Sequence, residues 1–230
     1  INWTGGSTIF SSESLFTASN GTMHIAVGNG VDNTLAYSYD GIIWKGLGKT
    51  IFSTQGNMVS YSSGKWVAVG EGTNTIAYST DGINWTGLGT TILSTKGLCV
   101  KYYNSRWIIG GEGSTHNLAY STDGINWTGL TKPLSTTCND IDYNGSRWIA
   151  VGIGTSNLIY SDDNGSSWTE SNVSIITDIY AISWSGNIWS AGGSGSNKII
   201  YTNDFVGITG WTASSSSLFS KVNKIFWSQD

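Results

Sequence analysis

The sequence predicts an all-β fold of short strands joined by tight turns, and three observations carry this prediction. Only 11% of the 230 residues are charged while 13% are aromatic, and the chain contains 31 glycines and one proline. Short runs rich in Val, Ile, Tyr, Trp and Thr alternate with clusters of Gly, Asn, Asp and Ser, as strands alternate with turns. The same pattern also returns at a fixed period along the chain, and no window shows a helical period.

The repeat is visible in two ladders of mostly aromatic residues. The first ladder has spacings of 41, 41, 42, 41 and 43 residues and consists of Trp3, Trp44, Trp85, Trp127, Trp168 and Trp211. The second has spacings of 42, 41, 41 and 41 residues and consists of His24, Trp66, Trp107, Trp148 and Trp189. Two ladders with one period indicate tandem structural units of about 41 residues.

Each unit divides into four strand-like segments, which we name a to d. In the second unit they are 57–63, 66–72, 75–79 and 83–88. A four-stranded unit of this length, repeated five times, is typical of a β-propeller blade. An open solenoid of stacked sheets is the alternative. We predict one β-propeller domain, 1–230, with repeats near 14–54, 55–95, 96–136, 137–177 and 178–221.

The ends of the chain bear on the number of blades. Segment d occurs once more at 1–5 (INWTG), and segment a occurs once more at 222–227 (VNKIFW). We predict a six-position ring in which these two closing strands belong to an incomplete last blade. About 20 further residues, from a longer gene product or a partner chain, would complete that blade. The alternative is a closed five-bladed ring with the extra strands at its edges.

The c–d turns share the pattern S-x-D-G-x-x-W, with a longer fourth copy, SDDNGSSW, and an insertion in the fifth, TNDFVGITGW. Their acidic residues are Asp40, Asp81, Asp123, Asp163 and Asp204. The pattern resembles the Asp-box, or BNR, repeat of β-propellers such as sialidases and sortilin-type receptors. The fourth copy matches the usual spacing, and the first three are one residue shorter. The resemblance implies a hairpin turn on the face of the propeller away from the active site.

The residues of this turn have structural roles of their own. The Asp carboxylate can accept backbone N–H bonds within its turn, and Gly supplies positive φ. The Trp is expected to bury on the order of 150–250 Å² between neighbouring blades. We therefore interpret these aspartates as structural. The alternative is a ring of acidic metal ligands or catalysts.

The resemblance to sialidases raises the question of catalysis. Sialidases use three arginines to hold the substrate carboxylate, but this chain has only Arg106 and Arg147, which occupy equivalent places before segment b. We predict a protein that is not an enzyme. A glycoside hydrolase using Glu71 or Glu112 is the third hypothesis for function, since such enzymes need paired carboxylates. Asp140 and Asp142 share one strand face and could bind a cation in the central channel, or remain simply solvated.

Composition excludes several other classes of protein. The net charge is −4 and no basic stripe is present, so we expect no nucleic-acid partner. No apolar run of membrane-spanning length and no signal peptide occur in this chain, and an extracellular or surface location is expected. His24 and His116 are too few for a metal site of known spacing, and we predict no metal or other cofactor. Cys99 and Cys138 are expected to be small buried thiols.

The b–c turns form a second repeated surface, on the face opposite the Asp-box turns. Each turn is rich in Gly and ends in an asparagine: Asn33, Asn74, Asn117, Asn157 and Asn197. Glycine lets a ligand approach the backbone, and asparagine offers a donor and an acceptor that suit sugar hydroxyls. We predict ligand binding by these asparagines together with Glu71 and Glu112. The alternative is that they are ordinary turn residues.

The favoured function is therefore a non-catalytic recognition or surface module. It would bind glycans or glycoproteins as a multivalent lectin or adhesin, gaining strength by avidity. The alternative function is a structural or protein-interaction scaffold, such as a viral or cell-surface component with a protein partner.

Overall fold

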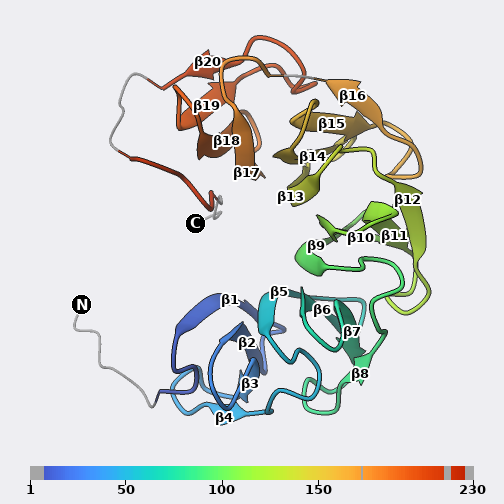
Figure 1. Cartoon of the computed structure of the whole chain (residues 1–230), viewed down its shortest axis with the longest axis vertical. Helices are drawn as coiled ribbons and strands as arrows, with labels where there is room; N and C mark the ends of the chain where they lie inside the picture. Colours follow the sequence, from blue (N-terminus) through green and yellow to red (C-terminus); the bar gives the residue numbers. More distant parts are fainter. Residues whose placement is uncertain (1–7, 172, 215–218, 226–230) are drawn as a thin grey trace.

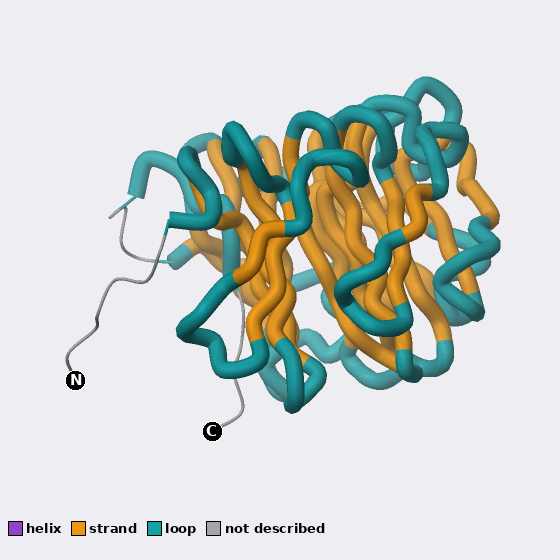
Figure 2. The backbone as a smooth tube through the Cα atoms, turned by 90° about the horizontal axis from the view of Figure 1, so that it is seen from below, coloured by secondary structure: helices purple, strands orange, loops and turns teal. Residues whose placement is uncertain are grey.

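The computed structural model describes residues 8–171, 173–214 and 219–225. The regular secondary structure within these ranges consists of β-strands. Five four-stranded antiparallel blades follow one another in chain order (Figure 1). The fold is a β-propeller, as the sequence predicts. The tube view shows the strands running between two layers of loops (Figure 2). The described ranges contain no helix able to cross a membrane.

Each blade has an inner, a second, a third and an outer strand. The inner strands are β1 (Glu13–Ser19), β5 (Gln55–Ser62), β9 (Lys96–Tyr103), β13 (Thr137–Tyr143) and β17 (Asp178–Trp184). The second strands are β2 (His24–Asn29), β6 (Lys65–Glu71), β10 (Arg106–Glu112), β14 (Trp148–Ile153) and β18 (Trp189–Ser194). The third strands are β3 (Leu35–Ser38), β7 (Ile76–Ser79), β11 (His116–Ser121), β15 (Leu158–Ser161) and β19 (Ile199–Thr202). The outer strands are β4 (Lys45–Gly46), β8 (Thr86–Gly87), β12 (Thr128–Thr131), β16 (Thr169–Ser171) and β20 (Thr212–Ala213).

Four tryptophans at or near the start of the second strands form the centre of the packing. Trp66, Trp107, Trp148 and Trp189 are completely buried. Each packs on an aromatic ring of its own inner strand, with ring centroids 4.7 Å apart for Tyr61 and Trp66 and 5.0 Å apart for Trp184 and Trp189. Aliphatic side chains of the second strands complete the core, as expected for sheets covered on both faces.

The c–d turns have the geometry that their residues predict. In blade 2, Ser79 Oγ donates to Asp81 Oδ1 and accepts the Gly82 N–H, at 3.0 and 2.9 Å. Asp81 Oδ1 also accepts the N–H groups of Ile83 and Asn84 at 2.8 and 2.7 Å, and Gly82 has a φ of +75°. These turns begin at the ends of the third strands and precede short outer strands. In blade 2 the outer strand is only β8 (Thr86–Gly87), whereas the predicted segment d covers 83–88.

The tryptophans of the c–d turns precede the outer strands. Trp44, Trp85, Trp127, Trp168 and Trp211 are all partly buried. Four of them, Trp85, Trp127, Trp168 and Trp211, pack against the hydrophobic core clusters. Trp85 Nε1 also donates to the Gly82 carbonyl of its own turn at 3.0 Å. The area that these rings bury between blades stays a prediction.

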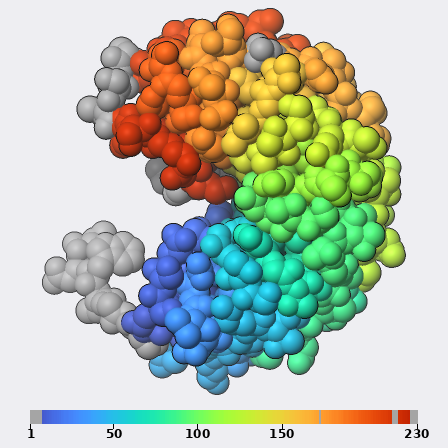
Figure 3. Space-filling view, viewed as in Figure 1, coloured from blue at the N-terminus to red at the C-terminus, as the bar shows by residue number. Residues whose placement is uncertain are grey.

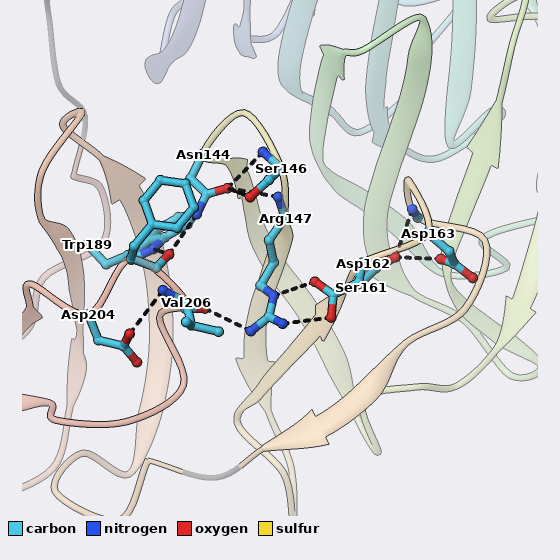
Figure 4. A network of polar contacts seen from close by, with 11 residues as sticks. Asn144, Ser146, Arg147, Ser161, Asp162, Asp163, Trp189, Asp204 and Val206 are labelled. Carbon is cyan, nitrogen blue, oxygen red and sulfur yellow. Dashed lines mark hydrogen bonds and ion pairs between the residues drawn. The ribbon is translucent and has the colours of Figure 1, made fainter.

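The c–d turns of blades 2 to 5 pack against the preceding blade. A Cβ on Gly124 of blade 3 would lie 3.0 Å from Val67 of blade 2, and one on Gly165 of blade 4 would lie 2.4 Å from Ile108 of blade 3. At three junctions, a basic residue of the preceding blade also donates a hydrogen bond to the c–d turn of the next blade. These hydrogen bonds join Lys65 Nζ to the Asp123 carbonyl, Arg106 to Ser166 Oγ, and Arg147 to the Val206 carbonyl. Arg147 also binds the Asp162 carboxylate through two N–H groups at 2.6 Å (Figure 4).

The five blades form an arc with blade 1 at one end and blade 5 at the other (Figures 1 and 3). Residues 221–225 occupy the place of a sixth inner strand beside blade 5. Val222 lies against Gly192 of β18 as Cys138 lies against Gly110 of β10, and Val222 N donates to the Gly193 carbonyl at 3.1 Å. This arrangement agrees with six positions rather than a closed ring of five. In the described part of 222–227, up to residue 225, no regular strand ladder forms, and the predicted strand 1–5 lies outside the described residues.

Candidate functional site

A pocket of about 430 Å³ lies between the inner strands, on the face that carries the b–c turns. Its wall is built from all five blades and from the C-terminal segment 221–225. The lining residues are Leu15, Gln55, Asn57, Leu98, Asn139, Tyr180, Lys221, Asn223 and Lys224. We call this cavity the central pocket. It is the place where the propeller brings one residue from every repeat to the same point.

A β-bulge in every inner strand explains this convergence. The pairing with the second strand skips one residue in each case, and the five skipped residues are Leu15, Asn57, Leu98, Asn139 and Tyr180. A bulged residue lies outside the regular ladder and its side chain is re-aimed. All five therefore reach the central pocket, and Asn223 holds the corresponding place in the C-terminal segment.

Polar groups in the central pocket are held by hydrogen bonds between blades. Asn57 Nδ2 donates to the Gly97 carbonyl at 2.7 Å, and Asn139 Nδ2 donates to the Ile179 carbonyl at 2.8 Å. Gln55 Nε2 donates to Asn57 Oδ1 at 2.6 Å. Among the described residues, Asn139 Oδ1 and the amide of Asn223 have no hydrogen-bond partner within the protein. Asn139 is half-buried and Asn223 is exposed, so these two groups are open to solvent or to a ligand.

Tyr180 and the C-terminal segment form the remaining wall of the pocket. The Tyr180 hydroxyl lies 3.3 Å from Asp178 Oδ2, and Lys221 Nζ lies 4.1 Å from the centroid of the Tyr180 ring. Lys224 Nζ lies 3.9 Å from Asp140 Oδ1. The segment therefore brings two ammonium groups to a pocket for which no Asp or Glu is among the described lining residues.

Asp140 and Asp142 of β13 accept hydrogen bonds from the neighbouring inner strand, β17. Asp140 Oδ2 accepts the Ile182 N–H at 3.2 Å, and Asp142 Oδ2 accepts the Trp184 N–H at 2.8 Å. Burial raises the pKa of Asp142, against the opposing charge of Lys101, whose Nζ lies 3.5 Å from Asp142 Oδ1. Each carboxylate thus has backbone and lysine partners. The described residues contain no group of three or more His, Cys, Asp or Glu arranged to hold a metal ion.

The predicted site asparagines hold the loops of the b–c face together. Asn33 and Asn74 accept the N–H groups of Gly48 and Gly89 at 2.9 and 2.8 Å. Each of the five asparagines also donates to a backbone carbonyl of a loop leading into an inner strand. Those carbonyls belong to Ile9 for Asn33, Ile51 for Asn74, Leu134 for Asn117, Val173 and Ile176 for Asn157, and Ile175 for Asn197. Ligand binding by these amides stays a prediction, and it would have to compete with these bonds.

The two glutamates lie at the ends of neighbouring second strands. Glu71 and Glu112 are both paired in register with Lys96 of β9. The Lys96 ammonium lies 3.3 Å from Glu112 Oε2, and both side chains are partly exposed. The structure therefore brings the two glutamates around one lysine at the rim of the b–c face. The role predicted for them is not decided by this placement.

The five predicted aspartates all lie in the c–d turns, just after the third strands, whereas the central pocket lies near the opposite ends of the strands, where the inner strands begin. Each accepts backbone N–H groups of its own turn, so the structure supports the interpretation that they are turn residues. They are far apart in the arc and are not brought together in a common site.

Comparison with known proteins establishes the fold. No protein-family model and no curated protein matches the sequence. A chain in the crystal structure of a nidogen/laminin complex has a TM-score of 0.64 at 11% identity, covering 93% of this chain and 84% of that chain. The GH74 enzyme of Niastella koreensis has a TM-score of 0.63 at 19% identity, covering 93% of this chain but 33% of its own. YCF48 bound to a D1 peptide has a TM-score of 0.60 at 16% identity, covering 86% and 65%. At these identities, the likeness shows a β-propeller and no particular function.

Proposed function

We propose that this protein is a non-catalytic recognition module that binds carbohydrate in the central pocket, at an extracellular or cell-surface location. The observation that carries the proposal is the convergence of the inner-strand bulges on one cavity. Pockets that join apolar walls to a few fixed polar groups are the usual form of small-ligand sites. Here Leu15 and Leu98 offer apolar surface, and the asparagines offer donors and acceptors for hydroxyl groups.

The c–d turns support a relationship with the Asp-box repeat family, which is part of this proposal. The carboxylate, the hydroxyl and the glycine of each turn are arranged as a compact hydrogen-bonded unit, illustrated by Ser79, Asp81 and Gly82. We place the ligand on the other face, where the resemblance to such propellers also puts binding.

A glycan array probed with the purified chain, monovalent and cross-linked, tests the proposal. We expect binding to a sugar class, with one site per chain in titration calorimetry. Leu98→Arg should block the central pocket and lower affinity at least tenfold. Thr73→Ala serves as the matched variant, because Thr73 is exposed on a b–c turn of the same face, and it should leave monovalent affinity unchanged.

The array also separates the two forms of sugar recognition. Several equivalent sites per chain, lost on changing Asn74 and Asn117, would favour the multivalent b–c turns over the central pocket. Unchanged affinity in those variants would count against the turns. Silence on the array in both formats would reject carbohydrate binding altogether.

A protein-interaction scaffold is the second candidate, and the face of blade 1 that no preceding blade covers among the described residues favours it. Ile42 and Ile43 of its c–d turn are 70% and 67% exposed, whereas their counterpart Ile83 in blade 2 is half-buried. A cavity of about 330 Å³ lined by Ile9, Phe10 and Trp44 lies on the same blade. Sedimentation velocity tests self-assembly, and Ile43→Lys should abolish any assembly formed through this face.

Lack of catalysis is also part of the proposal. A glycoside hydrolase using Glu71 or Glu112 would show turnover of an oligosaccharide substrate that falls on changing both residues to Gln. Unchanged turnover in that double variant would exclude these two carboxylates as the catalytic pair.

A further inference from the structure

The charge of the central pocket points to a narrower class of ligand. The described residues that line it include two lysines, Lys221 and Lys224, and no Asp or Glu. We propose that the pocket takes an acidic sugar, one that carries a carboxylate or sulfate group, and that these two lysines bind the anionic group. This inference rests on the proposed function and names the ligand of the same site.

Lys221 holds its ammonium group over the ring of Tyr180, whose hydroxyl lies 3.3 Å from Asp178 Oδ2. Its Nζ lies over the Tyr180 ring at 4.1 Å, and it forms no ion pair among the described residues. A ring face attracts a cation but carries no net charge, so the ammonium keeps its full attraction for an anion. Tyr180 therefore holds Lys221 at the wall of the pocket without cancelling its charge.

Lys224 has only a shared partner. Its Nζ is 3.9 Å from Asp140 Oδ1, at the limit of an ion pair, and its side chain is 43% exposed while that of Asp140 is 4% exposed. The same carboxylate also accepts the N–H groups of Ile141 and Ile182 at 3.0 and 3.2 Å. The partly exposed ammonium of Lys224 thus retains donors for a ligand oxygen.

The two lysines lie on one wall of the pocket. The other lining residues offer amide groups and apolar side chains to the uncharged part of a sugar. Val222 donates to the Gly193 carbonyl, and Val222 and Ile225 pack on Gly192, which fixes the segment between and beside the lysines. Asn139 lies on β13, while Leu15 and Leu98 lie on β1 and β9. An anionic group at the lysines would leave hydroxyl groups near the amides and the apolar face of a sugar ring near the leucines.

Titration of the full chain with lactose, 3′-sialyllactose and 3′-sulfolactose tests this inference, because the three differ in the anionic group. We expect the two acidic sugars to bind at least tenfold tighter than lactose. Lys221→Gln and Lys224→Gln should each weaken acidic-sugar binding roughly tenfold. Lys221→Arg and Lys224→Arg should keep the preference. Lys45→Gln on the outer strand β4 changes net charge equally and should have no effect.

The outcomes separate the two proposals. Equal binding of lactose and the acidic sugars, lost in Leu98→Arg, would overturn the acidic class and keep carbohydrate binding. Preference retained in both Lys→Gln variants would also overturn the inference. Inorganic sulfate that binds as tightly as 3′-sulfolactose would show a site for a free anion, against a sugar. Silence of these sugars and of the glycan array would overturn both proposals.

Discussion

Single carboxylates stabilise each c–d turn by collecting the N–H groups that the turn leaves unpaired. Asp81 is one example: the side-chain amide of Asn84 and the N–H groups of Asn84 and Ile83 all donate to it. These bonds, with that of the Asn84 side chain the largest, hold the pKa of Asp81 well below its ordinary value. The repeated aspartate is thus explained by backbone geometry, without a ligand.

Replacing Asp81 with Ala should lower the free energy of unfolding by about 1 kcal/mol, since several hydrogen bonds are lost at a site where water partly replaces them. Urea denaturation monitored by tryptophan fluorescence measures this. Asp32→Ala is the control, because Asp32 is exposed on a b–c turn and accepts no hydrogen bond from described residues. An equal loss in both variants would contradict the structural role of Asp81.

Acid should destabilise the protein through these same carboxyl groups. Burial opposes the lowering in Asp163, but hydrogen bonds from Ser167 and Ser166 outweigh it and reduce its pKa to about 2 from an ordinary 3.8. The pKa values of Asp40, Asp81, Asp123 and Asp204 are lowered as well.

Because the folded pKa of these groups lies below the unfolded value, their contribution is complete above about pH 4 and is lost as pH falls toward 2. Asp142, whose pKa burial raises, acts in the opposite direction but is one group against five. The urea midpoint should therefore fall between pH 4 and pH 2. Asp163→Asn should reduce the slope, and an unchanged slope would contradict its lowered pKa.

At three junctions between blades, a basic residue at or just before the second strand of one blade donates a hydrogen bond to the c–d turn of the next blade. Arg147 precedes β14, lies 4.2 Å from the Tyr160 ring centroid and reaches both Asp162 and the Val206 carbonyl (Figure 4). Lys65 and Arg106 make corresponding bonds at the two preceding junctions. The sequence shows these cations at equivalent places, but only the structure shows that each crosses to the next blade.

Arg147→Ala should lower the free energy of unfolding by about 1–2 kcal/mol, because it leaves Asp162 and a carbonyl without a charged donor. Arg147→Lys should recover only part of this, since lysine lacks the two-pronged geometry. Thermal unfolding measures both variants. Lys45→Ala removes a comparable cation over Tyr37, 5.9 Å away, within one blade, and should cost much less. A similar cost would contradict the importance of the cross-blade bond.

The same element-scale contacts show where sequence reasoning stops. The aromatic ladders predicted the blades because a large buried ring must recur wherever the packing recurs. The central pocket was missed because its bulged residues are Leu, Asn, Leu, Asn and Tyr, which share position but no chemistry. The b–c asparagines are visible in the sequence for the opposite reason, because they share one residue type; in the structure they also make similar backbone hydrogen bonds, and their role as ligand-binding residues stays a prediction. Aligning the inner strands by their buried residues would have revealed the common position.

At the scale of the whole molecule, the open arc makes the five blades unequal. Blades 2 to 4 have a neighbour on both sides, whereas the c–d turn of blade 1 packs on no preceding blade among the described residues. In tandem-repeat folds, stability depends on such contacts between neighbours.

Amide hydrogen exchange followed by mass spectrometry should therefore show faster exchange in β3 and β4 than in β11 and β12 at equal pH. The expected difference is about tenfold or more, because local opening of an end unit breaks one interface instead of two. Uniform exchange across all five blades would contradict this gradient. Peptides from the two regions in the same digest provide the internal comparison.

The contact between each c–d turn and the blade before it has a direction along the chain. Gly82, Gly124, Gly165 and Gly207 all pack on strands that precede them in the sequence. During synthesis, the strands on which each c–d turn packs are therefore translated before the turn itself. Assembly can proceed from the first blade onward, with every finished unit serving as the template for the one still being translated.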